Sequence, residues 1–157
     1  PYMYFEHKLL YRSVKEFVPD DYYTIEIGKA KLVSEGNDLS IITYGMGVHW
    51  ANEILTSMPD VKADVLDLRT LLPWDKEAVE QTVKKTNRVL ILHEDTLTGG
   101  IGAELSAWIT EHCFNHLDAP VMRVAGLDTA IPFAPTLENN FLPKGRLKGK
   151  IEELIKY

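Results

Sequence analysis

The chain has 157 residues, a length that suggests one domain or one domain with an appended arm. Hydrophobic residues make up 45% and charged residues 25%, so a hydrophobic core can form, and no apolar run approaches the ~18 residues of a membrane span. The net charge of −6 argues against non-specific binding to nucleic acid or anionic lipid. The single cysteine, Cys113, excludes an internal disulfide and fits a reducing, intracellular compartment.

The N-terminal residues indicate a piece of a longer chain. The sequence begins with Pro1 rather than methionine, and residues 2–5 resemble the end of a strand whose partners are absent. Residues 7–17 carry apolar side chains at a helical spacing, which Pro19 and two aspartates end. Processing of a short leader is the alternative explanation for this start. We expect residues 1–20 to form a junction arm and residues 21–157 to form the domain.

Strands and helices then alternate along the chain. β-Branched and apolar residues predict strands over 31–34, 39–44, 63–68, 88–92 and 121–125. Amphipathic spacing predicts helices over 48–58, 76–85, 101–114 and 147–155. Asp75 is a plausible N-cap for the second of these helices. We expect the first strand to pair with the second as a hairpin, and the Pro- and Asn-rich residues between the last strand and the last helix (127–145) to form a long ordered loop.

This alternation requires crossover connections between successive strands. Crossovers produce a largely parallel sheet that helices cover on both faces. We therefore predict an α/β fold with three layers, α/β/α, around a five-stranded, mostly parallel sheet that has one antiparallel edge strand near residues 31–34.

Polar side chains follow two of the predicted strands. His93 and Glu94 come directly after one apolar strand, and Asp67, Arg69 and Thr70 follow the preceding one. Because the carboxyl ends of parallel strands share one edge of the sheet, we expect these side chains to lie together. A histidine such as His93 can transfer protons near neutral pH, but we favour a role for this group of residues in contact with a neighbouring chain. We expect the Arg69 guanidinium to pair with a carboxylate, either Asp67 or Glu94 at this edge or one from a partner.

Three glycines, Gly99, Gly100 and Gly102, open the predicted helix over 101–114. Glycines at a helix start can cradle a phosphate, but a dinucleotide site places them directly after the first strand of the fold. Close packing of the helix start is the favoured interpretation. A self-contained nucleotide-binding domain remains the alternative.

The other candidate groups carry weaker signals. His112 and His116 are spaced to share a metal, but no further ligand accompanies them, so we predict surface or capping histidines beside an inert, half-buried cysteine. We assign no metal site and no catalytic residue. A mixed charged and aromatic cluster near the N-terminus is either a set of solvated charges or, as we prefer, a domain junction; its members are Glu6, Lys8, Tyr11 and Arg12.

Four sequence blocks, in order, resemble one known family. They are FEHKLLYR (5–12), DLRTLLPWD (67–75), HEDTLTGGIGAE (93–104) and APVMRVAGLDTAIPF (119–133). The set resembles the C-terminal half of the beta subunit of 2-oxoacid dehydrogenases, most closely the branched-chain (2-oxoisovalerate) type, over essentially the whole chain. Pyruvate and acetoin enzymes share most of the pattern, and a transketolase or deoxyxylulose-phosphate synthase fragment fits it less well. His7 stands where the family usually has proline.

The resemblance implies a fold similar to the transketolase C-terminal domain and a role in assembly and docking, without activity of this part alone. It implies a parent enzyme that decarboxylates branched-chain 2-oxo acids and passes the acyl group to a lipoyl arm. Thiamine diphosphate and Mg²⁺ would be held by the alpha subunit and the N-terminal half of the beta subunit. The implied partners are the alpha subunit, a second beta chain and the subunit-binding domain of the lipoyl acyltransferase. The implied location is the bacterial cytoplasm or the mitochondrial matrix, and an alpha–beta fusion remains an alternative.

Overall fold

The computed structural model describes residues 2–157, so the expectation that rests on Pro1 lies outside the described residues. The strands are β1 (Lys31–Ser34), β2 (Leu39–Thr43), β3 (Ala63–Asp67), β4 (Val89–Thr96) and β5 (Met122–Gly126). The helices are α1 (Leu10–Ser13), α2 (Met46–Thr56), α3 (Lys76–Thr86), α4 (Ile101–Cys113), α5 (Pro135–Phe141) and α6 (Lys144–Leu154), with a short 3₁₀ turn over Phe114–His116. The predicted alternation of strands and helices is confirmed.

The five strands form one sheet in the order β1-β3-β2-β4-β5. The strands β3, β2, β4 and β5 run parallel, and β1 lies antiparallel at the edge, as predicted. The predicted hairpin is wrong, because β1 pairs with β3 and not with β2. The turn after β1 explains this difference. The Gly36 N–H donates to the Asp64 carboxylate (2.9 Å), and a side chain at Gly36 would overlap the Lys62 backbone, so the turn lies against the start of β3.

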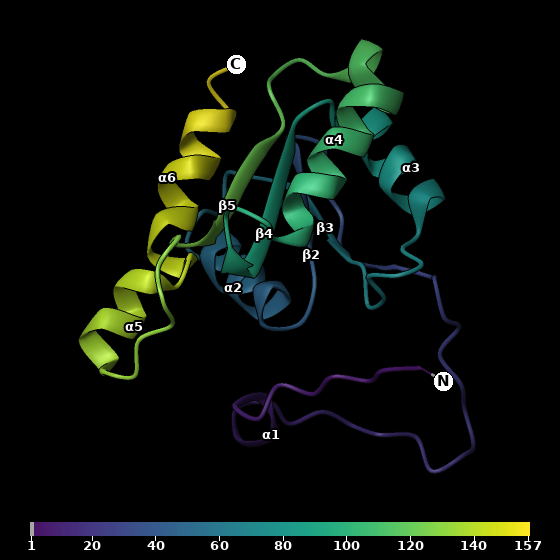
Figure 1. Ribbon diagram of the computed structural model, residues 1–157. Coiled ribbons are helices and arrows are strands. Elements are labelled where there is room, and N and C mark those ends of the chain that lie inside the picture. The colour runs from purple at the N-terminus through teal and green to yellow at the C-terminus, as the bar shows by residue number, and fades with distance from the viewer. Residues whose placement is uncertain (1) are drawn as a thin grey trace.

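Helices cover both faces of the sheet (Figure 1), which gives the predicted three layers. Ile41 packs with α2 and α6 on one face, whereas its neighbour Ile42 packs with α3 and α4 on the other. Adjacent strand residues point to opposite faces, so a strand that is buried on both sides is apolar throughout. Asp75 caps α3 as predicted, since its carboxylate accepts the Ala78 N–H at 3.1 Å.

Two local expectations differ from the structure. The helix expected over residues 7–17 is only the four-residue α1, because Leu9 and Phe17 remain exposed and an isolated short helix has little packing to stabilise it. The loop expected over residues 127–145 contains α5. Pro135 occupies the first turn of α5, and Phe141 at its end is buried against Gly126. The residues expected to end a strand, 2–5, lie in an exposed segment without strand pairing.

No helix within residues 2–157 combines the length and apolar character needed to cross a membrane.

Candidate functional site

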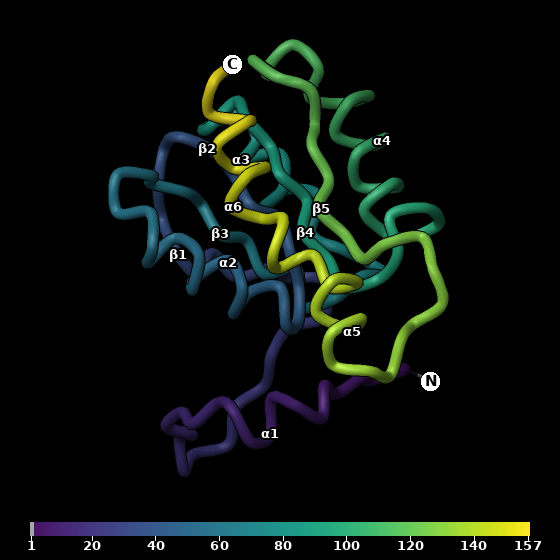
Figure 2. The backbone as a smooth tube through the Cα atoms, turned by 90° about the vertical axis from the view of Figure 1, so that its left-hand side faces the viewer, coloured from purple at the N-terminus to yellow at the C-terminus, as the bar shows by residue number. Residues whose placement is uncertain are grey.

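The carboxyl ends of β4 and β5 point toward the side of the molecule where the N-terminal arm runs. Figures 1 and 2 both show the arm, residues 2–27, as an extended segment separated from the body of the domain. The strand-end edge is the set of predicted site residues at this end of the sheet: Asp67, Arg69, Thr70, His93, Glu94, Gly99 and Gly100. The structure places them in different environments.

His93 lies inside the domain. The strand β4 continues through Thr96, so His93 is a strand residue rather than the first residue beyond the strand, and its exposed fraction is 0%. A Cβ atom at Gly100 would lie 2.6 Å from Cε1 of the ring, and one at Gly102 would lie 2.6 Å from Cδ2. The geometry therefore supports close packing of the helix start, with the imidazole as the neighbouring surface. This differs from the expectation that His93 faces a second chain.

The buried imidazole is neutral. Burial lowers the pKa of His93, and the nearby Asp95 carboxylate opposes this shift only in part. A ring with an exposed fraction of 0% is not in contact with solvent. Its role in this chain is to fill the space beneath the first turn of α4.

Asp67 and Arg69 form a local pair at the end of β3. The Arg69 N–H donates to Asp67 Oδ1 (3.1 Å), and Arg69 Nε lies 4.0 Å from Asp67 Oδ2. Burial raises the pKa of Asp67, and the Arg69 contacts counter part of that rise. Arg69 has a φ of 58°, a left-handed conformation that non-glycine residues seldom adopt. The sequence offers Asp67 and Glu94 as carboxylate partners for Arg69 within this chain, and the structure shows the contact with Asp67.

Thr70 has a connecting role. Its hydroxyl oxygen accepts the N–H of Gly28 at 2.9 Å. Two residues later, the N–H of Ala30 donates to Asp75 Oδ2 at 3.1 Å. These two hydrogen bonds fix the start of the compact domain to the segment that follows β3.

Glu94 contacts the N-terminal arm. His7 Nε2 lies 3.1 Å from Glu94 Oε2, and both side chains are about one-third exposed, at 32% and 41%. Tyr44 follows β2 at the same end. Burial raises the pKa of its hydroxyl, and the charges of Asp95 and Glu94 raise it further. The surface around Glu94, Asp95 and Tyr44 is therefore acidic, and the arm contacts it through His7.

The predicted junction cluster is exposed. Glu6, Lys8, Tyr11 and Arg12 all lie on the surface, and the Tyr11 hydroxyl donates to the Glu6 carboxylate. This hydrogen bond is the first cause of the raised pKa of Tyr11. Only Leu10 of the arm packs against a core cluster of the domain.

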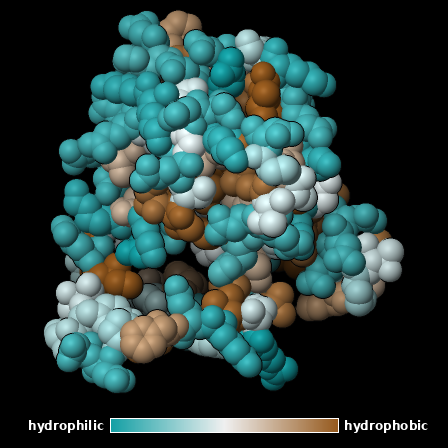
Figure 3. Space-filling model, turned by 180° about the vertical axis from the view of Figure 1, so that it is seen from behind, coloured by the Kyte–Doolittle hydropathy of each residue, from teal (hydrophilic) through white to brown (hydrophobic). Residues whose placement is uncertain are grey.

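Exposed apolar side chains gather at this same end. Tyr4, Phe5 and Phe17 on the arm are more than four-fifths exposed, and Phe133, in the loop before α5, is 98% exposed. Figure 3 shows brown hydrophobic surface around the hollow between the arm and the body of the domain. Large exposed apolar surface of this kind marks an interaction site.

Sequence reasoning misses two contributors to this end of the molecule. In the sequence, His7 stands out only as a departure from the family pattern, and its contact with Glu94 spans 87 residues. Phe133 falls in the expected long loop, for which no role is predicted. One sequence feature could have indicated that Phe133 is exposed. It forms an apolar pair with Ile131 on either side of a proline, in a segment for which no core partner is predicted.

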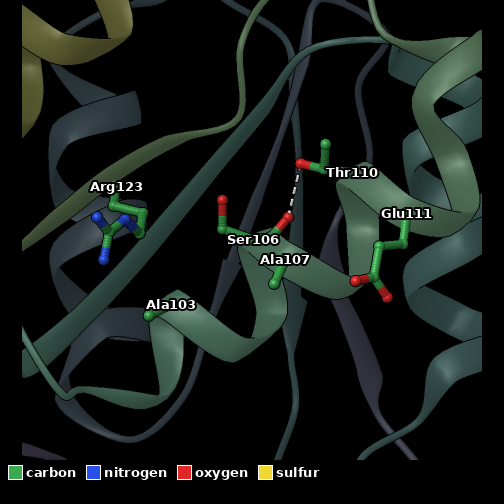
Figure 4. Close-up of a pocket in the computed structure, with 6 residues that line it drawn as sticks. All are labelled: Ala103, Ser106, Ala107, Thr110, Glu111 and Arg123. Atoms are coloured by element: carbon green, nitrogen blue, oxygen red, sulfur yellow. Dashed lines mark hydrogen bonds between the residues drawn. The ribbon is translucent and has the colours of Figure 1, made fainter.

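The remaining candidates stay apart from the strand-end edge. Cys113 is fully buried and burial raises its pKa, which favours the unreactive thiol. Across the described part of the chain, no group of three or more His, Cys, Asp or Glu residues could hold a metal ion. A hollow of about 390 Å³ beside α4 is lined mostly by small side chains (Figure 4); its residues are Ala103, Ser106, Ala107, Thr110, Glu111 and Arg123.

Comparison with known proteins gives a consistent family match. Residues 28–146 match the family model described as "Transketolase, C-terminal domain". The 2-oxoisovalerate dehydrogenase subunit beta of Bacillus subtilis is 43% identical over 161 residues, covering 100% of this chain and 49% of that protein. Subunit beta 2 of the mitochondrial 2-oxoisovalerate dehydrogenase of Arabidopsis thaliana is 41% identical, covering 100% of this chain and 44% of that protein.

More distant relatives share the same region. The pyruvate dehydrogenase E1 component subunit beta of Mycoplasma pneumoniae is 37% identical, covering 99% of this chain and 48% of that protein. Among solved structures, an inactive beta4 tetramer of a split-gene transketolase matches with a TM-score of 0.72 and 24% identity, covering 91% of this chain and 46% of that one. This structural likeness supports the fold. The chain spans about half the length of the curated relatives it matches.

Proposed function

Because the chain belongs to the transketolase C-terminal domain family, we propose that it forms the C-terminal part of the beta subunit of a 2-oxoacid dehydrogenase, an oxidoreductase. Its role there is assembly and docking. The observation that carries this proposal is the coverage: the whole chain aligns with about half of each 2-oxoisovalerate dehydrogenase beta subunit, at 41–43% identity. The branched-chain substrate is favoured over pyruvate by a small margin: the 2-oxoisovalerate subunits are 41–46% identical to this chain and the pyruvate subunits are 36–40% identical.

The cofactor of the parent enzyme would be bound elsewhere. We propose that thiamine diphosphate and Mg²⁺ are held by the alpha subunit and by the N-terminal half of the beta subunit. The residues that the structure describes do not fit such a site, since they include no candidate metal-binding group and the only buried imidazole is packed beneath α4. We therefore assign no chemical step to this chain.

The arm is proposed as the junction with the rest of the parent subunit. The sequence predicts that it ends at residue 20, but the exposed segment continues to residue 27. The hydrogen bond between the Gly28 N–H and Thr70, and the start of the family match at residue 28, support a proposed boundary near residue 28.

The apolar end of the molecule is proposed as the surface that meets the alpha subunit and a second beta chain. Obligate interfaces resemble a domain core and bury aromatic side chains, and both the arm and the loop before α5 expose such groups. We propose that the subunit-binding domain of the lipoyl acyltransferase docks on this chain. These partners place the parent in the bacterial cytoplasm or the mitochondrial matrix, the locations in which such complexes are expected.

The geometry gives less support to the alternative of a self-contained nucleotide-binding domain. A phosphate cradle needs glycine backbone open to the ligand. Gly100 and Gly102 instead face the buried ring of His93. Titration with ATP and with NAD tests this alternative, and measurable heat with either nucleotide would revive it.

The proposed function is tested by calorimetric titration of the chain with the acyltransferase subunit-binding domain from the same organism. Thiamine diphosphate with Mg²⁺ is titrated in parallel. Binding of the domain without binding of the cofactor is the expected result. Substantial 2-oxoacid decarboxylation by this chain alone, with the cofactor and metal supplied, would overturn the proposal.

A matched pair of variants in the full parent enzyme tests the proposed surface. Phe133→Ser removes an aromatic group from the apolar end, whereas Phe114→Ser removes one that is 69% exposed at the end of α4, away from the arm (Figure 1). The first variant should reduce assembly with the alpha subunit, measured by sedimentation velocity, and the second should not. Equal behaviour of the two variants would count against this surface.

A further inference from the structure

A small cavity lies between β5 and α6, which both Figure 1 and Figure 2 show side by side. Its volume is about 240 Å³, and its walls are formed by Leu97, residues 123–128, Arg146 and Lys150. No residue of the strand-end edge lines it. Three of the lining side chains are cations and one, Asp128, is an acid, so the lining carries a formal charge of 3 − 1 = +2 in a chain whose net charge is −6.

The two arginines are held in place by carbonyl groups. Arg146 donates from Nη2 to the carbonyl oxygens of Ala125 (2.6 Å) and Phe141 (3.1 Å). It also donates from Nη1 to the carbonyl oxygen of Asn140 at 2.8 Å. Arg123 donates from Nη1 to the carbonyl oxygen of Leu97 at 3.0 Å. These bonds fix both guanidinium groups before any ligand arrives, which reduces the entropy lost on binding.

The carbonyl contacts do not neutralise the guanidinium charges. Among residues 2–157, neither Arg123 nor Arg146 has a carboxylate within 4.0 Å. A carbonyl oxygen carries only a partial charge, and a guanidinium has five N–H donors, so donors remain available on each arginine. Asp128 attracts Arg123 and offsets part of its charge, but neither arginine has a direct ion pair among the described residues, and the lining keeps a net positive charge that is suited to an anion.

The other charged groups leave room for that anion. Asp128 turns its carboxylate toward Thr98, whose N–H and hydroxyl donate to it at 2.8 and 2.7 Å. Lys150 lies four residues after Arg146 on α6, so both side chains project from the same side of the helix. Lys150 pairs with Glu153 at 2.6 Å, but both side chains are about half exposed, and a pair of that kind is weak enough to exchange.

We propose that this cavity binds a small ligand through its phosphoryl group. The cationic lining residues come from two elements, β5 and α6, and a phosphoryl dianion has three acceptor oxygens and more charge than a single carboxylate to engage them. The volume is below the ~300–1,000 Å³ that encloses a drug-sized ligand, so the recognised part of the ligand is small.

The test is titration of the chain with inorganic phosphate and, separately, with acetate at matched ionic strength near 0.15 M, where exposed charges are largely screened. Chemical shifts of the backbone amides of Gly126 and Leu127 report binding at the cavity. Saturable shifts at these amides with phosphate, and much smaller ones with acetate, are expected. No saturable shift with phosphate, or equal shifts with acetate, would overturn the proposal.

Three variants make the test specific. Lys150→Gln should weaken phosphate binding by about 3- to 10-fold, as expected for the loss of one partly exposed charge contact. Asp128→Asn should strengthen binding, because it removes the one negative charge of the lining while retaining an acceptor for Thr98. Lys148→Gln, on the same helix but outside the cavity, is the control for net charge. If Lys148→Gln weakens binding as much as Lys150→Gln, the attraction is general and the site does not exist.

Discussion

The imidazole of His93 lies directly beneath Gly102 at the first turn of α4, so close that a Cβ atom on this glycine would lie 2.6 Å from Cδ2 of the ring. The ring is fully buried, and Gly100 makes a similarly close approach to it. This contact explains why the sequence carries glycines at the start of α4 without invoking a phosphate.

The first prediction concerns this contact. Gly102→Ala should lower the free energy of unfolding by about 1–3 kcal/mol, the range for overpacking a well-packed site. Gly149→Ala is the matched control, since Gly149 lies within α6 and a Cβ atom added there would meet no other atom within 4 Å; this variant should gain about 0.5–1 kcal/mol from helix propensity. Urea unfolding of both variants is the measurement. A neutral Gly102→Ala would show that the ring has room to move.

The second prediction concerns the pH dependence of stability. Burial lowers the pKa of His93 below its usual value, so the folded state disfavours the protonated ring. Below about pH 6.5 the unfolded chain binds a proton that the folded chain does not, and stability falls as the pH decreases from there. Replacing His93 with Gln should flatten the pH dependence of unfolding between about pH 5 and 7.

The control for the pH experiment is His116→Gln. His116 is exposed, and its replacement should leave the slope of stability against pH as in the unaltered chain. Only the slopes are compared, so a general loss of stability in the His93 variant does not affect the conclusion. A His93 variant that keeps the full slope would contradict the assignment of a buried neutral ring.

The third prediction concerns a buried carboxylate in the core of the fold. Asp64 is 1% exposed and accepts hydrogen bonds from Lys85 (2.6 Å), Thr82 (2.7 Å) and Gly36 (2.9 Å). Lys85→Met leaves this carboxylate without its cation and should cost about 1–3 kcal/mol in the free energy of unfolding. Chemical denaturation is the measurement.

The neighbouring lysine provides the control for that variant. Lys84 pairs with the exposed Glu80 at 2.6 Å, and Lys84→Met should cost at most about 0.5 kcal/mol. If the two lysine variants are equally stable, Asp64 does not depend on its cation for stability.

The fourth prediction concerns the contact between the arm and the domain. Glu94→Gln removes the negative charge that faces His7. Because the pair is partly exposed, the population of molecules with a detached arm should rise by a factor of up to about five. Limited trypsin digestion at Arg12 reports this opening. Glu152→Gln, which alters an exposed pair on α6, should leave the cleavage rate unchanged. Unaltered cleavage in Glu94→Gln would show that the pair does not hold the arm.

The fifth prediction concerns the single cysteine. Cys113 is fully buried and its pKa is raised by burial, so both access and thiolate formation are restricted. A thiol reagent such as Ellman's should label it only as fast as the domain opens, at least about 100-fold more slowly than the unfolded chain. Rapid labelling of the folded chain would contradict this.

The fold class and the layers could be predicted from the amino-acid pattern alone. Strand and helix periodicities are local properties, so the positions of β2, β3, α3 and α6 followed from the spacing of apolar residues, and Asp75 was identified as a cap from its place before α3. The ordered blocks of residues also indicated the family, because a family pattern is itself a property of the sequence.

The contacts between distant segments could be identified only in the folded chain. The pairing of β1 with β3 depends on where the Gly36 turn lies against Asp64, and the burial of His93 depends on how far β4 continues before α4 crosses it. The contact of His7 with Glu94 joins residues 87 positions apart. Each of these three contacts depends on three-dimensional packing between distant segments. The local sequence patterns of these segments are compatible with more than one arrangement, so residue spacing alone could not identify the contacts.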